Sequence, residues 1–365
     1  MKILIFSGKL TGGGAERVAV NMAEGLVDLG HDVTICCEPI GEKTYTPSSL
    51  VNLEFYPLQI RKSIFPKINV FARIWYMVRT IRRISPNVII GIIGDATCMA
   101  KIAQSLSFKH IPVIYSDHNT LQRPNSALMS KREKFLKFHF SKYCDAYTVL
   151  TEADKKYGET LGLKNIVVMP NPLFLQPIKV FPSKEKIILA NGRLNDWHCK
   201  GFDLLIEAWG KIASNHLDWR LQILGAGDEK DKETILHFAR KNKVEKRIDL
   251  LGYTKDVALY YQRAEIFVLA SRYEGFGLVL TEAMSQGCAC VAADYKGRQG
   301  EIITDGVDGL LCQTDNIEDL VEKLQRLIEN NDLRHYIQAS ATKNLDRFSI
   351  QTYAKRWDKL ICKLI

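Results

Sequence analysis

The most informative part of the sequence is Ile266-Phe267-Val268-Leu269-Ala270-Ser271-Arg272-Tyr273-Glu274-Gly275-Phe276-Gly277-Leu278-Val279-Leu280-Thr281-Glu282. Residues 266–270 are apolar and bounded by turn residues, so they predict a buried parallel strand. Residues 278–286 predict a helix that Gly287 ends. Between the two elements, Gly275 and Gly277 allow unusual backbone angles and a close approach to a ligand. The stretch therefore predicts a strand, a glycine turn and a helix.

Two carboxylates flank the start of this predicted helix. The first N–H groups of a helix, together with its dipole, favour an anion. Glu274 stands at the rim of the turn, and Glu282 lies about two helical turns further on. Carboxylates suit an anion site when they accept hydrogen bonds from sugar and ribose hydroxyls. The pair indicates a nucleotide sugar, and the alternative is an ordinary strand–turn–helix with two surface acids.

The spacing of these acids resembles the E-x7-E signature of family 4 retaining glycosyltransferases, which share the GT-B fold. The resemblance runs from Met1 to the last helix. It implies that Glu274 holds the donor sugar and that Glu282 holds the ribose hydroxyls. It also implies that the turn residues face the sugar and phosphates, namely Gly275, Phe276, Gly277, Leu278 and Val279.

The composition is that of a globular protein with two domains. At 365 residues the chain exceeds the usual size of one hydrophobic core. It is 46% hydrophobic and 25% charged, which is ordinary for such proteins. No run approaches the about 18 apolar residues of a membrane span. Residues 1–7 are too short for a signal peptide, so we expect a cytoplasmic protein.

Cysteine and metal chemistry are not expected. None of the nine cysteines forms a C-x-x-C pair, and most lie in apolar segments, which predicts reduced core residues. No D-x-D motif or cluster of histidines and carboxylates indicates a metal. We therefore expect no cofactor and no metal, with protein groups handling the diphosphate.

The formal net charge of +9 leaves nucleic acid, anionic lipid and anionic substrates as partners. Residues 55–94 contain no Asp or Glu, and their cations are Arg61, Lys62, Lys67, Arg73, Arg79, Arg82 and Arg83. An apolar stripe at helical spacing, predicted to pack on the N-terminal sheet, comprises Phe71, Ile74, Trp75, Val78 and Ile81.

The basic side of this helix predicts a membrane surface as partner. A second basic cluster comprises Lys131, Arg132, Lys134, Lys137 and Lys142. Both are expected to rest on an anionic cytoplasmic leaflet, which makes the protein peripheral on the inner face of the cell membrane. Nucleic acid is not expected, since no recognised nucleic-acid module accompanies the charge.

Strands alternate with helices along the whole chain, which predicts doubly wound parallel sheets. In GT-B terms, residues 1–172 form an acceptor-side Rossmann-like domain and residues 187–345 a nucleotide-sugar domain, facing across a cleft. Residues 173–186 are predicted to link them, since four prolines fall in residues 170–182. A last helix, within residues 346–365, is expected to cross back to the first domain.

Two cations follow the first strand of the second domain. Arg193 and Lys200 stand around a strand-to-helix turn, where a guanidinium and an ammonium bind phosphate oxygens. The family places donor-phosphate cations here, and they would neutralise the leaving diphosphate. The intervening loop, 195–199, is longer than in many relatives, which leaves Lys200 less firmly assigned than Arg193.

The first glycine turn carries a weaker signal. Gly12-Gly13-Gly14 precedes Arg17 but lacks the G-x-G-x-x-G pattern. Glu38 would supply the acid of a dinucleotide site, so this half alone leaves NAD binding open. The resemblance implies that Gly13 and Gly14 approach the donor and that Arg17 binds an acceptor phosphate or forms a salt bridge.

Further candidates follow other strands, where ligands gather in open α/β sheets. His118 is the best catalytic candidate of the first domain, because the family carries a histidine near the reacting sugar. Asp117 either orients it, contacts the acceptor or caps the next helix. In the second domain, the resemblance implies that Gly225 and Gly227 line the donor cleft and that Tyr253 packs on the base. The alternative for Tyr253 is an aromatic side chain that flanks a helix.

Together with the resemblance, these residues predict a retaining glycosyltransferase that moves a hexose or N-acetylhexosamine from a UDP-sugar to a glycan acceptor. The resemblance favours a lipid-linked oligosaccharide or lipopolysaccharide precursor as acceptor. The catalytic set is His118, Glu274, Arg193 and Lys200. The alternatives are a UDP-sugar 2-epimerase and a non-catalytic subunit that binds a sugar nucleotide.

Overall fold

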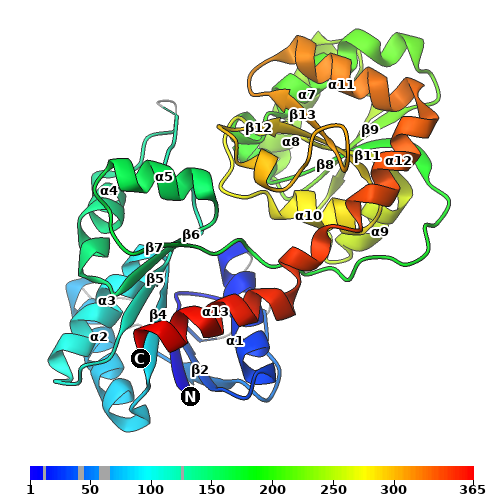
Figure 1. Cartoon of the computed structure of the whole chain (residues 1–365). Helices are drawn as coiled ribbons and strands as arrows, with labels where there is room; N and C mark the ends of the chain where they lie inside the picture. Colours follow the sequence, from blue (N-terminus) through cyan, green and yellow to red (C-terminus); the bar gives the residue numbers. More distant parts are fainter. Residues whose placement is uncertain (11–13, 40–44, 57–65, 125–126) are drawn as a thin grey trace. The chain divides into compact units, whose positions relative to one another are not determined.

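The computed structural model describes residues 1–10, 14–39, 45–56, 66–124 and 127–365. For residues 66–68 it describes the backbone alone. Gly12, Gly13, Arg61 and Lys62 lie outside these residues. The chain forms two compact units, one of residues 1–172 with 348–365 and one of residues 173–347. Each unit is built on one parallel sheet (Figure 1).

The first unit holds a seven-stranded sheet of order β3-β2-β1-β4-β5-β6-β7. Its strands are β1 (Lys2–Phe6), β2 (Asp32–Cys37), β3 (Asn52–Phe55), β4 (Val88–Ile92), β5 (Val113–Ser116), β6 (Ala146–Val149) and β7 (Ile166–Val168). Its helices are α1 (Gly14–Asp28), α2 (Pro66–Ile84), α3 (Ile93–Leu106), α4 (Lys131–Phe138), α5 (Glu152–Thr160) and α13 (Ile350–Leu364).

The second unit holds a six-stranded sheet of order β10-β9-β8-β11-β12-β13. Its strands are β8 (Glu185–Asn191), β9 (Arg220–Leu224), β10 (Ile248–Gly252), β11 (Ala264–Leu269), β12 (Ala289–Asp294) and β13 (Leu310–Gln313). Its helices are α6 (Trp197–Lys200), α7 (Phe202–Ile212), α8 (Glu229–Lys241), α9 (Val257–Arg263), α10 (Leu278–Ser285), α11 (Ile317–Glu329) and α12 (Asn331–Ala341).

These two sheets confirm the predicted parallel α/β class. Every described strand pair is parallel, and the strands that sequence periodicity predicts are present. Sequence reasoning missed β3 and β13, which are four residues each. Both are edge strands, and β3 is largely uncovered, so neither shows the apolar run of a central strand.

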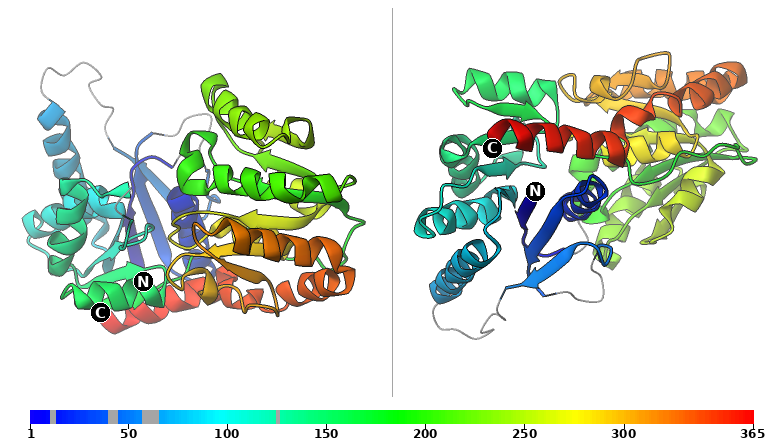
Figure 2. Two further views of the ribbon diagram at one scale, coloured as in Figure 1. Left: turned by 90° about the horizontal axis from the view of Figure 1, so that it is seen from above. Right: turned by 60° about the horizontal axis from the view of Figure 1, so that its bottom comes forward.

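The last helix belongs to the first unit, although it comes from the far end of the chain. In Figure 2 α13 runs beside α1. Gly25 makes this contact possible, since an added Cβ would lie 2.9 Å from the Cβ of Ala354. His31 Nε2 lies 3.0 Å from Asp358 Oδ1 and ties the same two elements together.

Helix α2 does not bury the predicted stripe. Val78 and Ile81 are buried with Met77 in the core of the first unit. Phe71 and Trp75, however, are 71% and 62% exposed, so the prediction was wrong for these two. The buried residues Met77, Val78 and Ile81 all come after Ile74, in the later turns of the helix. Phe71 and Trp75 lie toward its beginning and on the flank of the buried stripe. Within the described residues, no helix combines the length and apolarity that a membrane span requires.

Candidate active site

Three turns of the second unit meet at the carboxyl ends of neighbouring strands. They follow β8, β9 and β10, where ligands gather in sheets of this kind. Backbone hydrogen bonds join them from Gly192 N to Leu224 O (2.9 Å), from Leu194 N to Ala226 O (2.8 Å) and from Gly225 N to Gly252 O (2.9 Å). The turns therefore form one connected surface.

The predicted glycines allow these turns to pack closely. A Cβ on Gly225 would lie 1.8 Å from the carbonyl oxygen of Gly192. A Cβ on Gly227 would lie 2.6 Å from the Cβ of Leu194. Both distances are too short for real contacts, so glycine is required to hold the turn after β8 in place. Tyr253, which follows β10, has a side chain that is 68% exposed.

Arg193 extends from this surface into solvent. Its side chain is 73% exposed, and its guanidinium lies 3.5 Å from Asp196 Oδ2. An exposed pair at that distance holds an arginine only weakly. The guanidinium is therefore open to an anionic ligand.

Lys200 and Glu274 form an ion pair beside this surface. Gly201, at φ 64°, turns the chain so closely past β11 that its Cβ would lie 2.0 Å from Ala270 O. Lys200 Nζ consequently lies 2.8 Å from Glu274 Oε2, and Ser271 Oγ donates to the same oxygen at 3.4 Å. Burial alone would lower the pKa of Lys200, but the charge and hydrogen bond of Glu274 outweigh it and raise the pKa. The ammonium stays charged.

Arg272, within the opening motif, holds this pair in position, and sequence reasoning missed it. Its two terminal nitrogens donate to the two carboxylate oxygens of Asp203, each at 2.7 Å. One of them also donates to His198 O at 2.7 Å, and Nε lies 2.7 Å from Asp315 Oδ1. Its backbone N–H bonds Cys199 O at 2.8 Å. Arg272 thus joins the loop of Glu274 to the segment of Lys200.

The glycine turn enters α10 as the motif predicts. Gly277 is left-handed at φ 93° and precedes the helix, while Leu278 and Val279 are partly exposed. The first N–H groups of a helix lack partners within it and suit an anion. Phe276 requires a correction, since its side chain is 3% exposed and does not face a ligand. Its carbonyl accepts from Gln299 Nε2 at 3.4 Å, which braces the turn.

Glu282 lies deeper than a surface acid. It is 5% exposed, and the hydroxyl of Tyr261 donates to its Oε2 at 3.4 Å. Asn191 Nδ2 donates in turn to that hydroxyl at 2.9 Å. A buried acid tied to the end of β8 is not the ordinary surface acid of the alternative interpretation.

In the first unit, His118 is held on both ring nitrogens. Nδ1 lies 3.3 Å from Asn171 Oδ1, and Nε2 lies 3.1 Å from Ser116 Oγ. An amide oxygen accepts, so the neutral ring carries its proton on Nδ1 and Nε2 accepts from the serine. Burial lowers the pKa of His118 most, against the charge of Asp117. Asn171, which sequence reasoning did not single out, is one residue before the unit boundary at Pro172.

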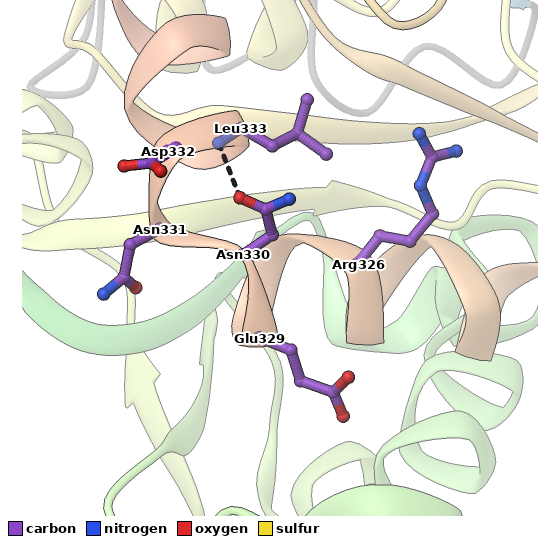
Figure 3. Close-up of a pocket in the computed structure, with 6 residues that line it drawn as sticks. All are labelled: Arg326, Glu329, Asn330, Asn331, Asp332 and Leu333. Atoms are coloured by element: carbon purple, nitrogen blue, oxygen red, sulfur yellow. Dashed lines mark hydrogen bonds between the residues drawn. The ribbon is translucent and has the colours of Figure 1, made fainter.

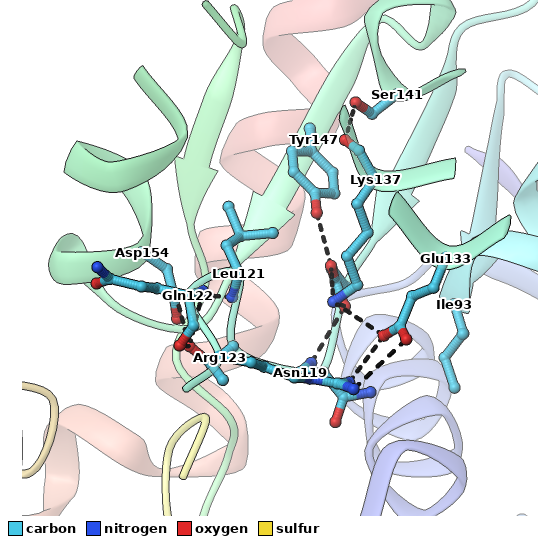
Figure 4. A network of polar contacts seen from close by, with 12 residues as sticks. Ile93, Asn119, Leu121, Gln122, Arg123, Glu133, Lys137, Ser141, Tyr147 and Asp154 are labelled. Carbon is cyan, nitrogen blue, oxygen red and sulfur yellow. Dashed lines mark hydrogen bonds and ion pairs between the residues drawn. The ribbon is translucent and has the colours of Figure 1, made fainter. Parts of the chain in front are cut away.

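The carboxylate of Asp117 is buried among protein groups, which contradicts its prediction as an acceptor contact. It is 2% exposed, and its carboxylate lies 2.8 Å from Lys137 Nζ. The hydroxyl of Tyr147 donates to it at 2.6 Å, and Asn119 N donates at 3.1 Å. Figure 4 shows the side chains of Lys137 and Tyr147 converging in this network. Lys137, 3% exposed, is therefore not part of a basic surface either.

The first glycine turn is described only in part, because Gly13 lies outside the described residues. Gly14 is exposed at the start of α1, and Arg17 is partly exposed in its first turn. Arg17 O accepts a hydrogen bond from Asn21 Nδ2 at 2.7 Å. Glu38, the acid of the dinucleotide alternative, pairs with Arg73 at 2.6 Å.

A hollow between α11 and α12 lies away from these residues (Figure 3). It is lined by Arg326, Glu329, Asn330, Asn331, Asp332 and Leu333. Glu329 lies 3.5 Å from His216, which precedes the amino end of β9, so the hollow is at the opposite end of the sheet. Among the residues that the structure describes, no group of three or more His, Cys, Asp or Glu side chains is placed to hold a metal.

Sequence comparison places the chain among known families. The model described as "Glycosyltransferase Family 4" matches residues 12–176. The model described as "Glycosyl transferases group 1" matches residues 174–344. The two matches meet near the boundary between the structural units.

Similar proteins cover the whole chain. An uncharacterized glycosyltransferase of Haemophilus influenzae is 28% identical over 96% of both chains. A Campylobacter jejuni α-1,4-N-acetyl-D-galactosaminyltransferase, named for a diphospho-undecaprenol-linked acceptor, is 27% identical over 100% of this chain and 99% of its own. The structure of Anabaena Alr3699/HepE in complex with UDP superposes with a TM-score of 0.80, at 18% identity over 100% of both chains.

Proposed function

Since this chain belongs to glycosyltransferase family 4, with the GT-B fold, we propose that it is a retaining transferase using a UDP-sugar. The donor sugar is a hexose or an N-acetylhexosamine. The acceptor is a lipid-linked glycan reached at the inner face of the cell membrane. The observation that carries this proposal is the charged Lys200–Glu274 pair at the strand ends that also bear Arg193.

UDP as the leaving group fits the charges of the second unit. When the bond from the anomeric carbon to the β-phosphate oxygen breaks, negative charge collects on UDP. Arg193 and Lys200, with the N–H groups at the start of α10, are the donors that would stabilise it. Glu282 would bind the ribose and Tyr253 the base. The UDP bound to the structurally similar Anabaena protein supports this donor class.

Glu274 is proposed to anchor the sugar rather than to attack it. Its Oε2 is engaged by Lys200 and Ser271, so it is oriented to accept a sugar hydroxyl. In the first unit, His118 is proposed to bond a donor hydroxyl or to support developing charge. Without a convincing nucleophile, retention requires the acceptor to attack from the face that UDP leaves. The α linkage in the name of the Campylobacter relative is compatible with retention.

A lipid-linked acceptor is supported by that relative, which is named for a diphospho-undecaprenol glycan. Such an acceptor is anionic and anchored in a bilayer, which suits a basic protein of net charge +9. We accordingly propose a peripheral position on the inner leaflet. Protein groups handle the diphosphate, so no metal is required.

A panel of UDP-sugars, with and without bacterial lipid extract, tests the proposal through UDP release. Transfer predicts release that depends on the extract. Conversion of the nucleotide sugar to an epimer would instead indicate a UDP-sugar 2-epimerase. Binding without turnover would indicate a non-catalytic subunit. Release that is insensitive to lipid extract but rises with a soluble glycan would reject the lipid-linked acceptor alone.

A further inference from the structure

Helix α2 presents aromatic and basic side chains to solvent in one stripe. Phe71 and Trp75 are 71% and 62% exposed, and Arg79 and Arg82 are exposed on the following turns. These positions are spaced by four, four and three residues, so they share one helix face. Large aromatic side chains are rarely left exposed in such a group without a partner.

The end of α3 extends this surface. Ile102 and Leu106 are 41% and 49% exposed, and Phe108, just beyond the helix, is 88% exposed. Arg82 donates to Leu106 O at 3.1 Å, so the two helices end side by side. Both cover the same face of the sheet, and Figure 1 shows them adjacent. We call Phe71, Trp75, Ile102, Leu106 and Phe108, with Arg79 and Arg82, the α2–α3 surface.

The charged residues of the segment that carries the α2–α3 surface are basic with one exception. Residues 66–116 contain a single acid, Asp95, which pairs with Arg132 at 2.8 Å. Arg73 and Arg83 are paired with Glu38 and Glu54, so their charges are compensated. Arg79 and Arg82 belong to the exposed stripe itself. The α2–α3 surface is therefore apolar and cationic together.

We propose that the α2–α3 surface docks on an anionic phospholipid bilayer. Trp and Phe prefer the interfacial layer of a membrane, and arginines beside them contact lipid phosphates. A second copy of this chain is a poor occupant, because two identical cationic faces repel each other. The inference rests on the proposed membrane-linked function and names the part of the fold that makes the contact.

Trp75 provides a direct measurement of this docking. Of the five tryptophans, Trp209, Trp219 and Trp357 are buried and Trp197 is partly buried, so Trp75 is the exposed one. Vesicles of brominated phosphatidylglycerol should quench its fluorescence, while brominated phosphatidylcholine should quench it far less. The variant Trp75→Phe should lose the quenching. An absence of quenching in the unmodified protein would overturn the proposal.

Sedimentation with phosphatidylglycerol vesicles gives the second readout. Phe71→Ser with Trp75→Ser, and separately Arg79→Glu with Arg82→Glu, should each weaken vesicle binding at least about tenfold. The matched control is Leu259→Ser with Tyr336→Ser, which changes two exposed apolar residues of the second unit. Equal binding by all variants would refute the surface. Binding of the surface to an acidic protein, with no vesicle binding, would also refute it.

Failure of the enzymatic proposal can be told apart from failure of this one. UDP release with a water-soluble, short-chain acceptor should be unchanged in the Phe71/Trp75 double variant. Release with the same acceptor glycan embedded in vesicles should fall. If no acceptor supports release, the quenching and sedimentation results still decide the docking surface.

Discussion

Lys200 Nζ lies 2.8 Å from Glu274 Oε2, so the ammonium and the first carboxylate of the motif are already joined. The side chains are 20% and 21% exposed, so the pair is largely buried at the strand ends. Under the proposed function, Lys200 would meet the diphosphate and Glu274 a sugar hydroxyl from these positions. Pre-organisation of this kind is what electrostatic catalysis requires.

Arg193→Ala should slow turnover without destabilising the fold. The side chain is 73% exposed and only weakly paired, so its loss should leave the melting temperature unchanged. Loss of one donor to the leaving group should lower kcat by about 10²–10³. Arg240→Ala, another exposed arginine of the second unit, is the control and should keep full turnover. Equal rates for both variants would remove Arg193 from the site.

Arg272→Ala should damage both stability and turnover. It leaves the carboxylate of Asp203 without its two-point partner and unties the Glu274 loop from the Lys200 segment. We expect a loss of about 1–3 kcal/mol in the free energy of unfolding, measured by urea denaturation. Arg272→Lys should recover part of the stability and little of the turnover, since a lysine cannot make the two-point contact. Normal kinetics in Arg272→Ala would show that it does not position the pair.

Much of this architecture could be predicted from sequence because it rests on local patterns. Short apolar runs predicted the central strands, and Gly275 and Gly277 predicted the turn before α10. The unpredicted features are long-range. Asp203, which binds both terminal nitrogens of Arg272, lies 69 positions away, and Asn171, which contacts Nδ1 of His118, lies 53 positions away. No local spacing signals such contacts.

The corrected predictions fail for a related reason. Hydrophobic periodicity identified α2 but could not show how far its first turns extend past the core, where Phe71 and Trp75 are exposed. Its position at the end of a strand suggested that Asp117 binds a ligand. Its carboxylate instead pairs with Lys137 and accepts a hydrogen bond from Tyr147. Charge patterns indicate which residues can pair, and the fold decides which of them do.

Gly225→Ala should perturb the proposed donor surface more than the same substitution does at a glycine with open space around it. Its new Cβ would meet Gly192 O at 1.8 Å, so the turn that bears Arg193 must shift. We expect a loss of about 1–3 kcal/mol, with weaker UDP binding in calorimetry. Gly162→Ala, at φ 73° with open space around it, should cost about 1 kcal/mol and leave UDP binding intact. Identical UDP affinities would contradict a role for the Gly225 turn.

The pH dependence of turnover should report the protonation of His118. Burial lowers its pKa, so the fold favours the neutral ring. The free energy of unfolding is therefore highest above about pH 6.5, the pKa of histidine in the unfolded chain. It decreases as the pH falls below that value, because the unfolded chain then takes up a proton that the folded protein does not. If the reaction requires the neutral ring of His118, turnover should decline only below about pH 6.5.

Asn171→Asp tests whether the contact between Asn171 and His118 sets the pH at which turnover declines on the acid side, the acid limb of the profile. A carboxylate beside Nδ1 raises the pKa of the ring, so the acid limb of kcat should move to higher pH. Asn171→Ala removes a hydrogen bond that favours the charged ring, so the limb should move to lower pH. A purely structural role would lower activity in both variants without moving the limb.

Release of UDP by the unmodified protein and by Lys200→Met is the decisive measurement for the proposed transfer reaction. With a productive UDP-sugar and lipid-linked acceptor, we expect acceptor-dependent release that falls by about 10²–10³-fold in Lys200→Met. Lys211→Met, an exposed lysine of the same unit, should release UDP at the unmodified rate. Equal release by all three proteins would reject the role of Lys200, and no release from any UDP-sugar and acceptor would reject the transferase itself.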